Sequence, residues 1–126
     1  MSNKNRDKGH RFERWWAKVF REDLGFKFCK TSRQASRLLD DCGVDLDGIP
    51  FNIQLKNGYA RGINYTQLFE SIDTKLAENY MKEDPRHVFP SVIAHKRGRK
   101  QSEHHVVMKA DDWIKLVKMA MRNKND

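Results

Sequence analysis

The sequence predicts an α/β fold in which helices flank a mixed central β-sheet. Apolar residues recur with the helical period in segments 11–20, 64–80 and 111–121. Between them, shorter segments show the alternation or the continuous apolar runs typical of strands. A chain of 126 residues accommodates one such domain. The expected order is helix, three strands, helix, two strands, helix, which is αβββαββα.

The first helix is expected over residues 11–20, after a polar start. Its apolar stripe consists of Phe12, Trp15, Trp16, Val19 and Phe20. Glu13 falls at the edge of this stripe, because successive helical residues are about 100° apart. Two interpretations of Glu13 stay open: a carboxylate that serves as a metal ligand, or a surface glutamate paired with a neighbouring Arg or Lys.

The next elements form the most informative part of the chain. Residues 26–30 are predicted as a first strand. Residues 44–46 and 51–56 are predicted as the two arms of a hairpin, joined by the turn residues 47–50. In the second arm Gln54 and Lys56 share one face, since side chains alternate along a strand. The turn brings Asp45 back toward Gln54.

These residue types suit phosphodiester hydrolysis with a divalent cation. Mg²⁺ prefers oxygen ligands and keeps several of its waters, so Asp45 and the Gln54 carbonyl could hold it. Lys56 could orient or help to deprotonate the attacking water, or neutralise the growing charge. The alternative is a solvated polar face on an antiparallel hairpin. Asp40 and Asp41, expected in a loop, and Asp47, expected in the turn, are rivals to Asp45.

The rest of the chain completes the predicted fold. A second amphipathic helix is expected over residues 64–80, a buried strand over 88–95, a further strand over 104–109, and a closing helix over 111–121. Residues 1–8 and 122–126 are expected to be flexible tails of a single domain, 1–126. Cys29 and Cys42 lack the spacing of a zinc site or a disulfide framework and are predicted to be free thiols.

The composition favours a nucleic-acid partner. The chain has 25 Lys and Arg against 17 Asp and Glu, a net charge of +8 and a pI near 9.7. No apolar run is long enough to cross a membrane, and the N-terminal residues do not resemble a signal peptide. A cytoplasmic location is therefore expected. The candidate DNA contacts are Lys8, Arg11, Lys30, Arg33, Arg37, Lys96, Arg97, Arg99 and Lys100.

The order of Glu13, Asp45, Gln54 and Lys56 resembles the PD-(D/E)xK nuclease superfamily, and most closely its small archaeal-type and phage Holliday junction resolvases. The resemblance covers roughly residues 9–110 and implies a restriction-endonuclease-like nuclease domain. It implies that Glu13, Asp45, Gln54 and Lys56 form the catalytic site. It also implies a polar loop after the first strand, over residues 30–36, and it adds Ser32 of this loop to the site. Glu13, Asp45 and Gln54 would be the metal ligands. Gln54 departs from the family, because most members have Glu at this position.

The resemblance also implies a function. A Holliday junction resolvase cuts four-way DNA junctions with Mg²⁺, for which Mn²⁺ can substitute, and acts in DNA recombination. Two symmetric cuts imply a homodimer, and a phage origin would place the protein in the host cytoplasm. The candidate residues for dimer contact are Val107, Met108, Trp113, Ile114 and Met121, with burial in the core as the alternative. Other functions stay open: a restriction-type or nicking DNA endonuclease, or a non-catalytic DNA-binding module on a nuclease scaffold.

Overall fold

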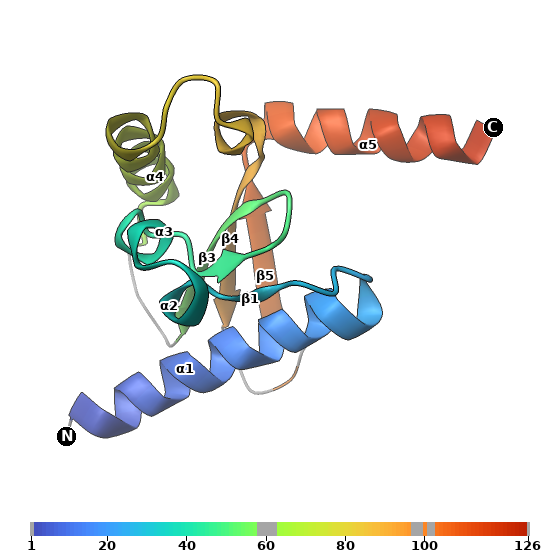
Figure 1. Cartoon of the computed structure of the whole chain (residues 1–126). Helices are drawn as coiled ribbons and strands as arrows, with labels where there is room; N and C mark the ends of the chain where they lie inside the picture. The colour runs from blue at the N-terminus through green and yellow to red at the C-terminus, as the bar shows by residue number, and fades with distance from the viewer. Residues whose placement is uncertain (1, 58–62, 97–99, 101–102, 126) are drawn as a thin grey trace.

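The structure is a computed structural model that describes residues 2–57, 63–96, 100 and 103–125, with side chains described for 7–57, 63–96, 100 and 103–122. Figure 1 shows helices around a small set of strands. The helices are α1 (Ser2–Lys18), α2 (Ser32–Ala35), α3 (Arg37–Asp41), α4 (Tyr65–Asn79) and α5 (Ala110–Asn125), with a π-helix, η1 (Val19–Asp23), and a 3₁₀-helix, η2 (Pro85–Val88). The strands are β1 (Lys30–Thr31), β2 (Leu46–Asp47), β3 (Asn52–Asn57), β4 (Ser91–Lys96) and β5 (His104–Met108).

The main sheet has three strands in the order β3-β4-β5 and is mixed. β3 and β4 are parallel, whereas β4 and β5 are antiparallel. A parallel pair needs a long crossover connection, and α4 lies within it. β1 and β2 form a separate antiparallel pair. The prediction of a mixed α/β sheet flanked by helices is confirmed.

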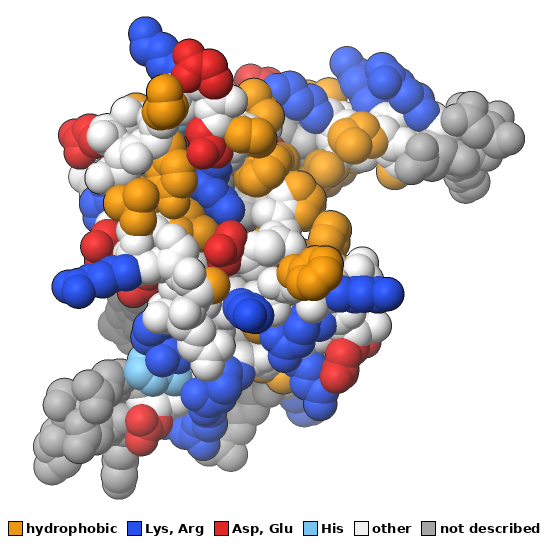
Figure 2. Space-filling view, viewed as in Figure 1, with side chains coloured by type: hydrophobic (Ala, Val, Ile, Leu, Met, Phe, Trp, Pro, Cys, Tyr) orange, Lys and Arg blue, Asp and Glu red, His pale blue; other side chains and the backbone are white. Residues whose placement is uncertain are grey.

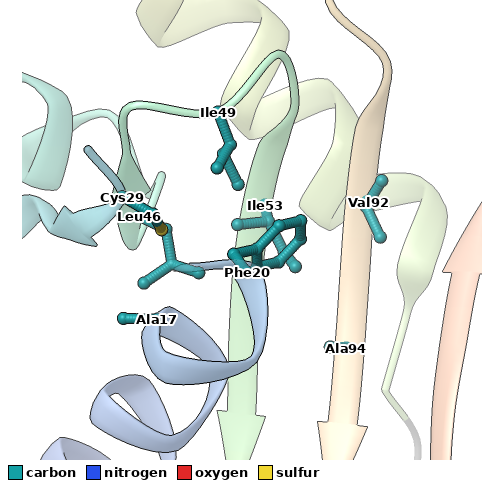
Figure 3. Close-up of a cluster of buried hydrophobic side chains, with 8 residues drawn as sticks. All are labelled: Ala17, Phe20, Cys29, Leu46, Ile49, Ile53, Val92 and Ala94. Atoms are coloured by element: carbon teal, nitrogen blue, oxygen red, sulfur yellow. The ribbon is translucent and has the colours of Figure 1, made fainter. Parts of the chain in front are cut away.

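The larger core lies between α1 with η1 and one face of the sheet. Ala17 and Phe20 point toward Ile53 of β3 and toward Val92 and Ala94 of β4 (Figure 3). The remaining buried members are Cys29, Leu46 and Ile49. The apolar stripe predicted for the first helix accordingly faces the apolar face predicted for residues 51–56. This packing fixes α1, and with it Glu13, against the strand that carries Gln54 and Lys56.

The opposite face of β3 is covered as well, by α3 and α4. Leu39, Cys42, Val44, Ile72 and Leu76 form a second buried cluster there. In the alternative interpretation, the polar face of residues 52–56 is solvated. This interpretation is wrong at Asn52, the first residue of that face, because Asn52 is 2% exposed. A strand covered on both faces holds its polar side chains at fixed positions, since buried polar groups need partners.

Between residues 26 and 47 the structure differs from the prediction. Phe26–Cys29 is a turn, in which the Cys29 N–H donates to the Phe26 carbonyl (3.0 Å), so β1 retains only Lys30–Thr31. The polar loop 30–36 contains helix α2, and Asp40 and Asp41 lie in α3 rather than in a loop. α3 begins where the Ser36 hydroxyl accepts a hydrogen bond from the Leu39 N–H (3.2 Å). Helices of four or five residues are too short to leave a periodic apolar signal.

Two further strand boundaries shift. β2 comprises Leu46–Asp47, so Asp47 is in a strand and not in the turn. The strand predicted over 88–95 begins at Ser91, because Asp84 caps η2 by accepting a hydrogen bond from the Arg86 N–H (2.9 Å). The predicted helices over 64–80 and 111–121 are confirmed as α4 and α5. The terminal segments 2–8 and 122–125 are helical, whereas their flexibility stays a prediction.

Both cysteines are free and buried, as predicted. Trp113, Ile114 and Met121 of α5 are exposed, so the alternative that they belong to the core is wrong, whereas Val107 and Met108 of β5 are partly buried. Within the described part of the chain, no helix is long and apolar enough to span a bilayer.

The Arg86 side chain links η2 to the two ends of the segment that connects β2 with β3. Its Nη1 donates to Asn52 Oδ1 (2.9 Å) and its Nη2 to Asp47 Oδ1 (3.2 Å). Asn52 returns a hydrogen bond from Nδ2 to the Arg86 carbonyl (2.9 Å). The network therefore ties η2 to β2 and β3, which are distant from it in sequence, and it engages Asp47 at the end of β3 that begins with Asn52.

We expect Arg86→Ala to lower the free energy of unfolding by about 3 kcal/mol. The substitution removes two charge-assisted hydrogen bonds and leaves the buried side-chain oxygen of Asn52 without its donor. Urea unfolding measures the loss. Lys109→Ala is the matched control. Lys109 forms an ion pair with Asp73 (2.7 Å) in which both side chains are exposed, so the pair should contribute under about 1 kcal/mol to stability. Equal losses in the two variants would contradict a structural role for Arg86.

Candidate active site

Asp45 is held by backbone hydrogen bonds from two directions. Its N–H donates to the Ile53 carbonyl (2.8 Å), and its own carbonyl accepts the Ser32 N–H (2.8 Å). Its carboxylate Oδ2 accepts the Leu55 N–H at 2.7 Å. Asp45 thus connects the β1–β2 pair to β3, which confirms the prediction that the turn brings Asp45 back to the strand of Gln54. The side chain is fixed at the level of residues 53–55. The predicted hairpin between residues 44–46 and 51–56 is wrong, because β2 pairs with β1 and β3 pairs with β4.

Gln54 is oriented by Gly43, two residues before Asp45. The Gln54 Nε2 donates to the Gly43 carbonyl at 3.1 Å. Gly43 has φ of +82°, and a Cβ at this position would stand 2.9 Å from Gln54 Nε2, so glycine serves both the turn and the close approach. The amide oxygen Oε1 is buried and has no hydrogen-bond partner among the described residues. Buried acceptors in folded proteins usually have a partner, so this amide oxygen is an exception.

Lys56 follows Gln54 on the same face of β3. Its pair in the parallel register is His95 of β4, which is fully buried and lies 3.4 Å, Nδ1 to Oη, from Tyr65 of α4. Paired residues of neighbouring strands point to the same face of a sheet. His95 and Tyr65 are therefore part of the surroundings of Lys56. The sequence indicated neither of them, because His95 ends an ordinary apolar run and Tyr65 opens an ordinary helix.

Glu13 approaches the site from α1. Its carboxylate Oε2 lies 3.4 Å from Nε of Arg33 in α2, with both side chains partly exposed. The interpretation of Glu13 as a glutamate paired with an arginine is confirmed, whereas its role as a metal ligand stays a prediction. Its negative charge raises the pKa of Asp45. If a metal cation replaced Arg33 as the partner of Glu13, the Glu13 carboxylate would remain beside Asp45.

Ser32 and the rival aspartates are placed differently around Asp45. Ser32 is buried at the start of α2, next to the Asp45 carbonyl. Asp40 of α3 acts on Asp45 through its charge, Asp41 is exposed, and Asp47 is engaged by Arg86 and by the Gly48 N–H (2.8 Å). Asp45 is the aspartate whose carboxylate bonds to the strand of Gln54 and Lys56.

The surroundings of Asp45 disfavour its charged form. The pKa of Asp45 is raised to about 7: burial is the largest cause, the charges of Glu13 and Asp40 add to it, and the Leu55 N–H and Lys56 oppose it. A buried carboxyl whose pKa is raised in this way is a common feature of functional sites. A bound divalent cation would reverse this balance by favouring the ionised form.

We expect this burial to appear as a pH dependence of stability in the metal-free protein. The folded state holds the Asp45 proton up to about pH 7, whereas an unfolded Asp loses it near 3.8, so the contribution is full at low pH and lost as pH rises from about 4 to 7. The loss is at most roughly 4 kcal/mol. Denaturant unfolding in a chelator should show wild type losing stability over this range relative to Asp45→Asn. A constant difference between the two proteins would contradict the raised pKa.

The donor set fits a hard divalent cation. Asp45 offers a carboxylate, Gln54 an unpartnered amide oxygen and Glu13 a second carboxylate after it leaves Arg33. Within the described ranges, no cluster of three or more His, Cys, Asp or Glu side chains stands ready for a metal. A metal site at this position would therefore need the neutral oxygen of Gln54 beside the carboxylates.

Basic side chains surround this region. Figure 2 shows Lys and Arg gathered over the lower half of the molecule, where α1 crosses the strands. The exposed members among the predicted DNA contacts are Lys8, Arg11, Lys30, Arg33, Arg37 and Lys100, and Lys96 is partly buried over the ring of Phe12. Arg97 and Arg99 lie outside the described residues. Acidic Asp45 and Glu13 therefore lie within a basic surround, as phosphate binding at a metal site requires.

A scan against protein-family models found no match to the chain, and searches among curated proteins and among solved structures found none either. The assignment of a function consequently depends on the geometry described above and on the resemblance of its residues to a known motif.

Proposed function

We propose that the protein is a metal-dependent DNA endonuclease of the PD-(D/E)xK type, most closely a Holliday junction resolvase that cuts four-way junctions by phosphodiester hydrolysis. The observation that carries the proposal is the meeting of Asp45 with the strand of Gln54 and Lys56. Asp45 bonds to the Leu55 N–H, between these two residues, and Gln54 has a buried, unpartnered oxygen. The mixed sheet with helices on both faces is compatible with a restriction-endonuclease-like fold.

The chain's own residues have distinct roles in this proposal. Asp45, Gln54 and Glu13 would hold Mg²⁺ or Mn²⁺, and the bound cation would supply charge neutralisation at the phosphate. Lys56 orients the attacking water or stabilises the charge that develops on the phosphate oxygens. Arg33, once Glu13 turns away, is free to contact a phosphate on the same face. Ser32 holds the backbone of Asp45 in place through its N–H.

Gln54 provides a graded test of metal ligation. Gln54→Glu adds a negative charge to the ligand set, whereas Gln54→Ala removes a ligand. We expect the metal concentration for half-maximal cleavage to be lowest in Gln54→Glu, intermediate in wild type and highest in Gln54→Ala. Metal titrations of cleavage measure it. An Ala variant that matches wild type would show that the amide oxygen is not a ligand.

The substrate is tested by direct comparison. A labelled four-way junction and a linear duplex of the same sequence are incubated with the protein and Mg²⁺ or Mn²⁺. Symmetric cuts in the junction and an intact duplex support a resolvase. Cutting of the duplex on both strands supports a restriction-type enzyme, and cutting of one strand supports a nickase.

A second candidate function is a non-catalytic DNA-binding module, and one observation favours it: Glu13 is paired with Arg33, so that one proposed ligand is occupied within the protein itself. In this case the junction would be bound and left uncut at every metal concentration. Arg33→Ala separates the two functions. It frees Glu13, so cleavage that appears or rises at low metal concentration supports a nuclease.

A further inference from the structure

The turn between η1 and β1 presents an aromatic ring to the solvent. In Figure 1 this turn follows the end of the first helix and leads into β1. Phe28 is 82% exposed, more than any other large apolar side chain in the described part of the chain, whereas Phe26 and Cys29 pack against the core. A single exposed apolar side chain is common on protein surfaces, so its meaning depends on how it is held and on what surrounds it.

The backbone on both sides of the Phe28 ring is fixed. Arg21 Nη1 donates to the Cys29 carbonyl (2.9 Å), and the Cys29 N–H donates to the Phe26 carbonyl (3.0 Å). Gly48 has φ of +83° and lies against the Phe28 carbonyl, with which a Cβ at this position would collide. A ring on a fixed backbone loses little conformational freedom on binding, which favours a contact made by the ring itself.

Exposed cations flank the ring. Lys27 precedes Phe28 and Lys30 follows it, and both lysines are exposed. Exposed and buried residues alternate from 28 to 31, so Phe28 and Lys30 emerge on the same side of the chain. Further along the chain, Arg33 and Arg37 are exposed as well.

The acidic residues near the turn do not offset these cations. Glu22 and Asp23 belong to η1, before the turn, and no Asp or Glu occurs from residue 24 to residue 39. Asp47, which pairs with Lys30 in the β1–β2 register, is engaged by Arg86. The charge around Phe28 therefore suits an anionic partner.

Phe28 lies within reach of a nucleic acid bound at Asp45. The Ser32 N–H donates to the Asp45 carbonyl (2.8 Å), and Phe28 is four residues before Ser32. Four residues span at most about 14 Å. Successive bases of one strand are about 3.4 Å apart, so the ring is within about four nucleotides of a phosphate at Asp45.

We propose that Phe28 stacks on an unpaired base of the DNA, while Lys27 and Lys30 contact the phosphates beside that base. The inference rests on the proposed function for the identity of the partner as DNA. Every base has a π-face, so the contact requires an unstacked base and not a particular sequence. It therefore favours DNA with an opened base step, such as a branch point, over a uniform duplex.

A protein partner fits this surface less well. One aromatic side chain buries at most about 250 Å², whereas each partner of a standard protein interface buries about 800 Å². A stacked base needs no larger surface than the ring itself. The lysines on both sides of the ring match the phosphates that accompany every base.

The first test measures affinity for DNA in a chelator, so that nothing is cut. The probes are a four-way junction and a linear duplex of the same sequence, and the assay is a gel-shift titration. Phe28→Ala should weaken junction binding at least about fivefold and duplex binding less. The slope of log affinity against log salt should stay the same, because no phosphate contact is lost. Met81→Ala is the matched control: Met81 is 78% exposed beyond α4, close to Glu83 and Asp84, and its loss should not change affinity.

The second test detects the unstacked base. 2-Aminopurine is a fluorescent base whose emission is quenched by its neighbours in the stack. Junctions that carry it at single positions near the branch point should show a rise in emission with wild type and little rise with Phe28→Ala. Phe28→Leu keeps an apolar side chain without a π-face and should behave like Phe28→Ala. Urea unfolding checks that both variants keep wild-type stability.

The outcomes separate this inference from the proposed function. Unchanged affinity in Phe28→Ala, wild-type behaviour of Phe28→Leu, or an equal rise in emission with wild type and Phe28→Ala would overturn the stacking contact and leave the nuclease proposal standing. A change in sedimentation of Phe28→Ala without DNA would instead assign the ring to a protein partner. A wild-type protein that binds the junction and never cuts it would overturn the nuclease alone. One that binds neither probe would overturn both.

Discussion

Asp45→Asn and Lys56→Ala should each abolish cleavage while leaving junction binding nearly intact. The Asp45 carboxylate is bonded to β3, and Lys56 is a residue of β3, so the proposed site places both at the reacting phosphate and neither among the basic DNA contacts. Loss of one electrostatic contributor of this type costs roughly 100- to 1000-fold in rate, and loss of the anchoring metal ligand should cost at least as much. Single-turnover cleavage of a labelled junction measures the rate.

The rival aspartates supply the controls for this experiment. Asp41→Asn changes an exposed carboxylate in α3 and should leave the rate unchanged. Asp45→Asn should also be more stable than wild type at neutral pH, because it replaces a buried carboxyl, whose pKa is raised to about 7, by a neutral amide. Lost activity with gained stability separates a chemical role from misfolding. Wild-type cleavage by Asp45→Asn, or loss of cleavage in Asp41→Asn, would show that the site is wrongly assigned.

The sequence predicted those parts of the fold that have a clear period. α4 was predicted to within a residue at each end, because Asn64 caps it and its apolar residues recur regularly. β3 was predicted as well, because its apolar residues also recur regularly. The segment from Phe26 to Asp47 was not, since β1 and β2 have two residues each and α2 and α3 are single turns. Such elements are stabilised by contacts with the rest of the chain and not by their local pattern.

The proximity of Asp45 to the strand of Gln54 was predictable from a turn and an alternation. The partners of these residues were not. Arg33 reaches Glu13 only because α2 replaces a loop, and His95 reaches the neighbourhood of Lys56 only through the parallel register of β3 and β4. Register between distant strands is determined by the packing of both faces, which a single sequence does not reveal.

The last prediction concerns the affinity for DNA, which we expect to fall steeply with salt. Six of the predicted contacts are exposed, among them Lys30 and Arg33, and they belong to separate segments around the site. If about six phosphates are neutralised, affinity should fall roughly 1000-fold between 50 and 200 mM salt through the release of counterions. The measurement is a gel-shift titration of Asp45→Asn, which binds without cutting, at several salt concentrations.

Substitution of individual basic residues shows whether the basic face of α1 and β1 provides this affinity for DNA. The double variant Arg11→Ala/Lys30→Ala should reduce the slope of log affinity against log salt by about 2, since each lost phosphate contact contributes about 0.9. Lys82→Ala changes an exposed lysine that follows α4 and should leave the slope unchanged. A salt-independent affinity would contradict a nucleic-acid partner altogether. An unchanged slope in the double variant, with a steep wild-type slope, would move the DNA to another face of the protein and away from Asp45.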